Sequence, residues 1–242
     1  PEVGAKIYLK YRSCDIKSDL KDFYGGLFAF GNGEFVEKGH IKLKSKIPLH
    51  ILINDPGKVL KIIKDKKDNF HNLEVILTKP LYKDVIGEPG YNILNSKHIT
   101  YISISSLKKW SSLGNRISSQ GYTKIFEETL PESFKKIANK ASKKKNEIDQ
   151  INTVTSLLND KVQYIGDWRS VEGRMFPRGL RKTSTSQLGD CKDFASVTAA
   201  ILSSIGYRTQ IVLVRRGVGN FYFKSLPDLW AFNHAIVKVP NK

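Results

Sequence analysis

The strongest constraint on the fold of this chain is an amphipathic helix pattern that begins just after a cysteine. Apolar residues recur at three- to four-residue spacing from Phe194 to Ile205, which predicts one buried helix stripe, and Gly206 then ends the pattern. Cys191 falls in the first turn, where unpaired backbone N–H groups and the helix dipole favour thiolate over thiol. The position therefore predicts a nucleophile, with a small buried core residue as the alternative interpretation.

A histidine further along the chain offers a base for this thiol. His234 lies in a segment, residues 230–239, whose composition predicts a strand. A lone histidine in a strand is more often a core residue, but nucleophilic thiol catalysis needs a base within hydrogen-bond reach. The pair Cys191 and His234 therefore favours the catalytic interpretation. Asp190, directly before the cysteine, is expected to cap the helix rather than to react.

The first 105 residues carry the signals of short strands. Alternating or apolar runs are separated by turns rich in glycine and proline, a spacing typical of an antiparallel β-sandwich. The four histidines of this half fall at no metal-site spacing, so we expect neither a metal nor a cofactor. The expected strands are residues 5–11, 41–47, 50–53, 73–77 and 98–105.

After Trp110 the pattern changes to helices. A long irregular loop over residues 167–187 leads into Cys191, and a strand is expected at residues 210–214. The expected helices begin near Pro131 and near Asn146, with a lysine-rich hinge over residues 139–147 between them. The chain is therefore predicted to be α+β, with a partial β-sandwich domain over residues 1–115 and a second domain over residues 116–242.

The residues around the cysteine and the histidine resemble the bacterial transglutaminase-like domain. The resemblance implies a papain-like core, C-terminally truncated in this chain, in which the nucleophile begins a helix packed on an antiparallel sheet. The strands before it resemble the later part of a sandwich domain of unknown function that commonly precedes such cores. The matching residues are Val162–Gly166, a loop around Pro177, Gly189-Asp190-Cys191-Lys192-Asp193, Gly206 and Phe232-Asn233-His234-Ala235-Ile236-Val237.

This resemblance implies a Cys-His-Asp triad with Cys191 as nucleophile and His234 as base. The acid of the family lies on the strand after the histidine, so we expect it beyond Lys242. Asp228 precedes the histidine in the wrong segment and is not promoted to this role. A triad without its acid is impaired by orders of magnitude in serine enzymes, and we expect the same of this fragment.

Acyl transfer also needs hydrogen-bond donors for the developing oxyanion. The backbone N–H of Cys191 is the first candidate. By resemblance to animal transglutaminases, an upstream tryptophan supplies the second, which places Trp168 in that role with Tyr164 in reserve. The alternative for Trp168 is an aromatic residue that packs a loop against the core.

The implied function is a cysteine hydrolase or acyltransferase that acts on peptide amides through a thioester acyl-enzyme, with a peptidase favoured. A protein or peptide is the expected substrate. The alternative is a non-catalytic module that binds a peptide or a cell-envelope polymer, with a degenerate or truncated core. Hydrolysis and amine transfer are not distinguished by the sequence, because the choice depends on the shape of the cleft.

The charge of the chain raises a third possibility, nucleic-acid binding. With 40 Lys and Arg against 23 Asp and Glu, the formal net charge is +17, which attracts anionic partners. The densest lysine cluster, over residues 135–145, lacks the interleaved aromatics that stack on bases, so a solvated helix face is expected there. No specific nucleic-acid motif is present.

Few signals indicate the compartment. No apolar run reaches the length of a membrane span, and the chain opens on Pro1 without a start methionine or a signal-peptide pattern, as expected of a cut fragment. The two cysteines, Cys14 and Cys191, do not suggest a disulfide framework. A bacterial, exported or cell-envelope location is implied only by the family resemblance.

Overall fold

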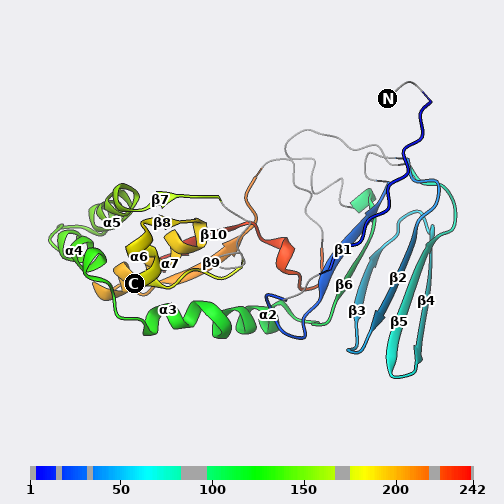
Figure 1. Ribbon diagram of the computed structural model, residues 1–242, viewed down its shortest axis with the longest axis horizontal. Helices are drawn as coiled ribbons and strands as arrows, with labels where there is room; N and C mark the ends of the chain where they lie inside the picture. The colour runs from blue at the N-terminus through cyan, green and yellow to red at the C-terminus, as the bar shows by residue number, and fades with distance from the viewer. Residues whose placement is uncertain are drawn as a thin grey trace.

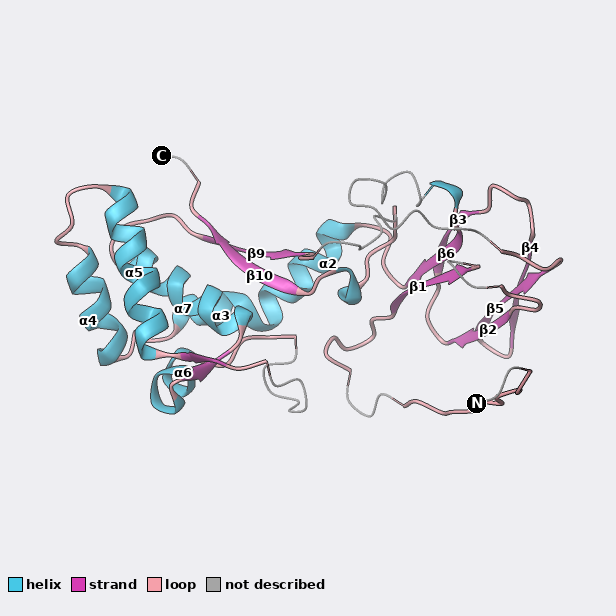
Figure 2. Ribbon diagram, turned by 90° about the horizontal axis from the view of Figure 1, so that it is seen from above, coloured by secondary structure: helices cyan, strands magenta, loops and turns pink. Residues whose placement is uncertain are grey.

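The computed structural model describes residues 4–14, 18–31, 35–82, 97–166, 175–217 and 224–240. The fold is α+β, as predicted, and its sheets are mainly antiparallel. The strands β1 to β6 lie at one end of an elongated molecule, α3 to α7 with the small sheets β7–β8 and β9–β10 lie at the other, and α2 lies between them (Figures 1 and 2). No helix within these ranges is both long and apolar enough to cross a membrane.

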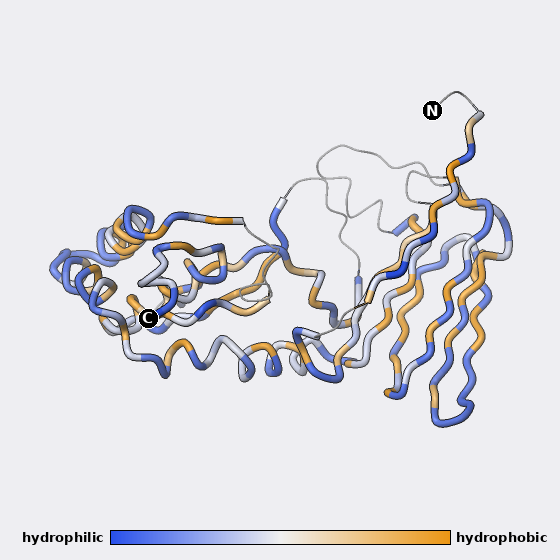
Figure 3. Tube along the Cα trace, viewed as in Figure 1, coloured by the Kyte–Doolittle hydropathy of each residue, from blue (hydrophilic) through white to orange (hydrophobic). Residues whose placement is uncertain are grey.

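Two three-stranded antiparallel sheets build the first end of the molecule. Their strand orders are β1-β6-β3 and β2-β5-β4. Both sheets contribute to one hydrophobic cluster, with Ile102 and Ile104 from one sheet and Val75 and Leu77 from the other, so the sheets pack against each other. Blue and orange alternate along several of these strands, as half-buried strands require (Figure 3). The strands are β1 (Gly25–Phe30), β2 (His40–Ser45), β3 (His50–Asn54), β4 (Leu60–Lys67), β5 (Phe70–Leu77) and β6 (Thr100–Ser105).

The expected strands at residues 41–47, 50–53, 73–77 and 98–105 are confirmed as β2, β3, β5 and β6. The strand expected at residues 5–11 is wrong. Among the described residues this segment pairs with no strand, and its large apolar side chains are exposed. An alternating sequence pattern does not form a strand unless a neighbouring strand pairs with it. The sequence missed β1, which begins with two glycines, and β4, which carries four lysines. Both residue types are depleted in strands.

The helix α2 begins at Trp110, where the sequence predicts the change of pattern to helices. The first helical stretch continues from α2 through η1 to α3 without a loop. The expected helices near Pro131 and Asn146 are confirmed as α4 and α5, and the hinge between them is shorter than expected. The predicted boundary between two domains, at residues 115 and 116, stays a prediction. The helices are α2 (Trp110–Ile117), the π-helical η1 (Ser118–Tyr122), α3 (Thr123–Glu127), α4 (Glu132–Ala141), α5 (Glu147–Lys161), α6 (Leu180–Ser186) and α7 (Cys191–Ser204).

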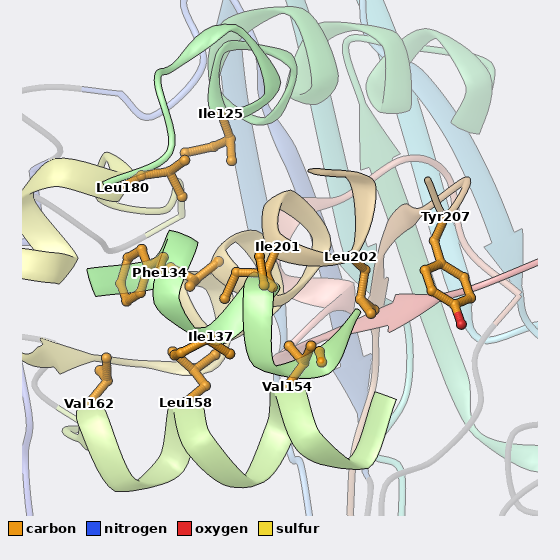
Figure 4. Close-up of a cluster of buried hydrophobic side chains, with 13 residues drawn as sticks. Ile125, Phe134, Ile137, Val154, Leu158, Val162, Leu180, Ile201, Leu202 and Tyr207 are labelled. Carbon is orange, nitrogen blue, oxygen red and sulfur yellow. The ribbon is translucent and has the colours of Figure 1, made fainter. Parts of the chain in front are cut away.

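The helix α7 lies at the centre of the helical end of the molecule. One side packs into a cluster with α4 and α5, where Val197, Ile201 and Leu202 meet Phe134 and Leu158 (Figure 4). Another side packs on the antiparallel pair β9 (Gln210–Val214) and β10 (His234–Lys238) through Ala195. The helix ends at Ser204, and Gly206 follows its C-cap with a φ of 94°, a conformation that favours glycine. The predicted helix, and its packing on an antiparallel sheet, are confirmed.

Candidate active site

The candidate nucleophile begins the central helix. Cys191 is the first residue of α7 and is 5% exposed. Asp190 is the N-cap, and its Oδ1 accepts a hydrogen bond of 2.9 Å from the Lys192 N–H. In return, Asp193 Oδ2 accepts a hydrogen bond of 2.9 Å from the Asp190 N–H, which completes a capping box. The backbone around the thiol is therefore fixed on both sides.

Four buried charges surround this first turn. Lys192 Nζ lies 2.7 Å from Asp190 Oδ2, and the guanidinium of Arg178 forms an ion pair with Asp193. Asp193 Oδ1 also accepts a hydrogen bond of 2.6 Å from the Arg178 N–H. Burial raises the pKa of Asp193, and the hydrogen bonds from Asp190 and Arg178 oppose that rise. Two carboxylates face two cations, so the charges balance, as burial requires.

The candidate base lies at the start of a strand rather than inside one. The sequence predicted a strand over residues 230–239, whereas β10 begins at His234 and follows the 3₁₀ turn Leu229–Ala231. His234 pairs with Val214 in β9. Just before it, Asn233 exchanges two side-chain hydrogen bonds with the backbone of Arg216, of 2.6 Å and 2.8 Å. These bonds close the end of the β9–β10 pair and hold the backbone next to the histidine.

Cys191 and His234 line one cavity of about 370 Å³. Within the described part of the chain, no hydrogen bond joins their side chains and no carboxylate binds the His234 ring. Such bonds are often long in a free enzyme and shorten in the substrate complex. The other lining residues are the apolar Met175, Leu213, Trp230 and Phe232 and the polar Asp19, Lys192 and Asn233.

Tyr164 lies on a short strand beside the segment that leads into Cys191. The short strands β7 (Gln163–Tyr164) and β8 (Leu188–Gly189) pair in parallel, with Tyr164 opposite Gly189. Burial raises the pKa of Tyr164, and the charges of Cys191 and Asp190 and a hydrogen bond with the Cys191 thiol add to the rise. The backbone N–H of Cys191 acts in the opposite direction. The Tyr164 ring packs on Phe194, with centroids 5.8 Å apart, so it lies beside the first turn of α7.

The six-stranded end of the molecule holds the segment that leads into His234. One face of β6 packs into the core between the sheets, and the other face binds residues 224–227. This arrangement sets the path of the chain into the 3₁₀ turn and β10. The three hydrogen bonds run from Tyr101 Oη to the Lys224 carbonyl (3.2 Å), from the Leu226 N–H to Ser103 Oγ (3.0 Å) and from Ser105 Oγ to the Pro227 carbonyl (2.7 Å).

The other residues singled out in the sequence have varied positions. Trp168 lies outside the described residues. Asp228 caps the 3₁₀ turn, with its Oδ1 accepting a hydrogen bond of 3.0 Å from the Trp230 N–H, and it does not line the cavity. Part of the loop expected over residues 167–187 is the helix α6, whose short polar sequence has little periodicity. No group of three potential metal ligands occurs within the described ranges.

The sequence did not predict most of the cavity wall. Asp19 and Met175 come from segments with no catalytic motif, and they reach the site only through tertiary packing. Phe232 was noted within the histidine motif but not as a lining residue. Its ring packs edge to face on Trp110, with centroids 5.6 Å apart. No sequence signal marks such a contact between distant segments.

Comparison with known proteins gives a structural likeness. No family model matches the sequence, and no curated protein does. A crystal structure described as a "putative protease" from Parabacteroides distasonis superposes over 92% of this chain, with a TM-score of 0.66 and 14% identity. This chain covers 42% of the length of that protein. A "putative cysteine protease" from Cytophaga hutchinsonii is 9% identical over 90% of this chain and 74% of its own, with a TM-score of only 0.33. The chain therefore shares the fold of the part of the Parabacteroides distasonis structure on which it superposes.

Proposed function

We propose that this chain carries the nucleophile and the base of a cysteine peptidase or acyltransferase, with a peptidase favoured. The observation that supports this most strongly is that Cys191, at the start of α7, and His234, at the start of β10, line the same cavity. A thiol at a helix start with an imidazole beside it is the arrangement that nucleophilic acyl transfer requires. The apolar wall of the cavity gives a peptide side chain a place to bind.

In this proposal, His234 removes the proton of the Cys191 thiol, and the thiolate attacks the carbonyl carbon of an amide. The carbonyl π electrons move to oxygen, and the backbone N–H of Cys191 stabilises that oxyanion. When the carbonyl re-forms, the C–N bond breaks, and the amine leaves with the proton from the imidazolium. Water, activated by His234, then cleaves the thioester and restores the thiol. Trp168 remains the sequence-based candidate for a second oxyanion donor.

The proposal can be tested on the chain itself by labelling with iodoacetamide. Cys14 is exposed and Cys191 is buried, so exposure alone predicts faster labelling of Cys14. An activated nucleophile reverses this order, because the thiolate is the reacting form. We expect Cys191 to react faster in the native protein and at an ordinary rate in urea, measured by mass spectrometry of the peptides.

His234→Ala provides the matched variant. We expect it to slow the labelling of Cys191 and to leave Cys14 unchanged. Faster labelling of Cys14 than of Cys191 in the native wild-type chain would contradict the proposed function and would favour a non-catalytic binding module. Equal labelling of Cys191 in the wild type and in His234→Ala would remove the histidine from the base role.

A further inference from the structure

The cavity beside Cys191 has an acidic residue in its wall. Asp19 lines this cavity and comes from the segment before β1. Its carbonyl accepts a hydrogen bond of 2.7 Å from Gln120 Nε2, and the next residue, Leu20, is buried in the cluster that contains Leu113. These contacts with the first helical stretch hold the backbone of the acidic residue at the cavity.

The carboxylate of Asp19 is available to a ligand. Within the ranges that the structure describes, no hydrogen bond or ion pair joins it to another group. The other residue of the wall with a permanent charge is Lys192, whose Nζ lies 2.7 Å from Asp190 Oδ2. Because that pair is neutral, the charge that the wall offers beside His234 is negative. Its sign is opposite to that of the chain, whose formal net charge is +17.

The rest of the wall also suits a cation with a long apolar stem. Trp230 and Phe232 bring aromatic rings to the cavity, and the Phe232 ring is held edge to face by Trp110 at 5.6 Å between centroids. The face of an aromatic ring attracts a cation, and tryptophan does so most strongly. Met175 and Leu213 add aliphatic surface. Arginine and lysine match such a wall, because their methylene stems pack on apolar surface while the charged end finds a polar partner.

We propose that the cavity binds an arginine or lysine side chain of a peptide, next to the carbonyl that Cys191 attacks, and that Asp19 selects for its positive charge. This inference rests on the proposed function and names the class of its substrate. A cavity of about 370 Å³ holds one long side chain. That side chain stays charged and takes no part in the reaction. A neutral side chain leaves the carboxylate without a partner, and an acidic one is repelled by it.

Two affinity labels that differ in one charge test the proposal on the chain itself. They are acetyl-Ala-Arg and acetyl-Ala-citrulline chloromethyl ketones. With either label the Cys191 thiolate bonds to the methylene carbon and chloride leaves, so a thioether forms. Citrulline carries a neutral urea in place of the guanidinium on the same stem, so the ratio of the two rates isolates the effect of charge. Mass spectrometry of the peptides measures both rates at Cys191 and, as an internal reference, at Cys14.

We expect the arginine label to react with Cys191 about 10- to 100-fold faster than the citrulline label, the range for a hydrogen bond to a charged group. Cys14 should show little preference. Asp19→Asn should remove most of the preference at Cys191 and leave the citrulline rate nearly unchanged, because the amide has the size of the carboxylate. Asp68→Asn is the matched control, since Asp68 lies in the exposed turn between β4 and β5, and it should keep the preference.

Other outcomes overturn the inference. A ratio near one in the wild type, or a ratio that Asp19→Asn leaves unchanged, would show that Asp19 does not select the substrate. An equal loss of both rates in Asp19→Asn would show that the residue supports the shape of the cavity and not its preference for charge. The proposed function fails in a different way, because it requires Cys191 to react faster than Cys14 with both labels. A slower Cys191 with both labels would contradict that function whatever the ratio.

Discussion

The carboxylate of Asp193 joins the first turn of α7 to Arg178, which lies at the end of the segment before α6. It accepts hydrogen bonds from the Arg178 N–H and guanidinium and from the Asp190 N–H. Asp193 is fully buried, and the Arg178 side chain is 10% exposed. Cys191 thus begins a helix whose first turn is held by buried charge from a neighbouring loop.

Arg178→Met should therefore destabilise the chain strongly. The change leaves Asp193 buried without its counter-charge, and breaking a buried ion pair by removing one partner costs about 3–5 kcal/mol. Urea unfolding, followed by circular dichroism, measures the loss in the free energy of unfolding. Lys135→Met is the control, because Lys135 and Glu132 form an exposed pair of 3.4 Å that contributes less than about 1 kcal/mol. A similar small loss in both variants would contradict the structural role of Arg178.

Glycine substitutions test how closely the six-stranded end meets the segment before His234. A Cβ at Gly25 would lie 2.6 Å from the Pro227 carbonyl oxygen and 2.9 Å from Asp228 Cα. Both are backbone atoms, so Gly25→Ala must displace the segment, and overpacking of this kind costs about 1–3 kcal/mol. Thermal unfolding measures the effect.

Gly114→Ala is the matched control for Gly25→Ala. Gly114 lies inside α2, and a Cβ there meets nothing within 4 Å. Alanine should stabilise the helix by about 0.5–1 kcal/mol, because it removes the conformational freedom of glycine from the unfolded chain. Opposite signs for the two substitutions are the expected result. A stabilising Gly25→Ala would show that the segment is not in contact with β1.

The parts of the fold that the sequence predicted are those with a local periodic signal. The stripe from Phe194 to Ile205 predicted α7, since one helix face is enough to bury it. By contrast, β1 and β4 are strands because a neighbouring strand pairs with each of them. The strand β6 pairs with the glycine-containing β1, and β5 pairs with the lysine-rich β4. Their local preferences do not show this.

The residues of the candidate site likewise include some that the sequence predicted and some that it did not. Cys191 and His234 could be predicted because their residue types and flanking segments carry the chemistry. Asp19 and Met175 could not, because their places in the wall of the cavity depend on how distant segments pack. Tyr164 was only a reserve candidate, since the parallel pair β7–β8 that places it opposite Gly189 has two residues in each strand, too few for a pattern.

Asp228 makes the stability of the chain depend on pH in a defined direction. Burial raises its pKa above the ordinary value of 3.8, while the Trp230 N–H and Arg215 oppose the rise. The native state therefore keeps a proton at pH values where the unfolded chain has released it. The stabilisation from this group is complete below pH 3.8 and is lost as the pH rises through the native pKa.

Asp228→Asn should remove this loss, because asparagine resembles the protonated carboxyl and its Oδ1 still accepts the hydrogen bond from the Trp230 N–H. The free energy of unfolding of the variant, minus that of the wild type, should increase as the pH rises above 3.8 and then level off. Urea unfolding from pH 4 to pH 8 measures this difference. A difference that is constant or decreasing over that range would contradict the direction given for Asp228.

Ser105 links the sheet to the path of the chain into the candidate base, so its loss should affect both stability and reactivity. It is fully buried, donates a hydrogen bond of 2.7 Å to the Pro227 carbonyl and accepts one of 3.1 Å from the Leu107 N–H. Ser105→Ala leaves both partners unpaired, at a cost of about 1–3 kcal/mol in the free energy of unfolding. Because Pro227 precedes the turn that leads into His234, we also expect slower alkylation of Cys191 by iodoacetamide. The exposed Ser112→Ala on α2 should change neither quantity, and a normal alkylation rate in a destabilised Ser105→Ala would show that the sheet supports the fold without positioning the histidine.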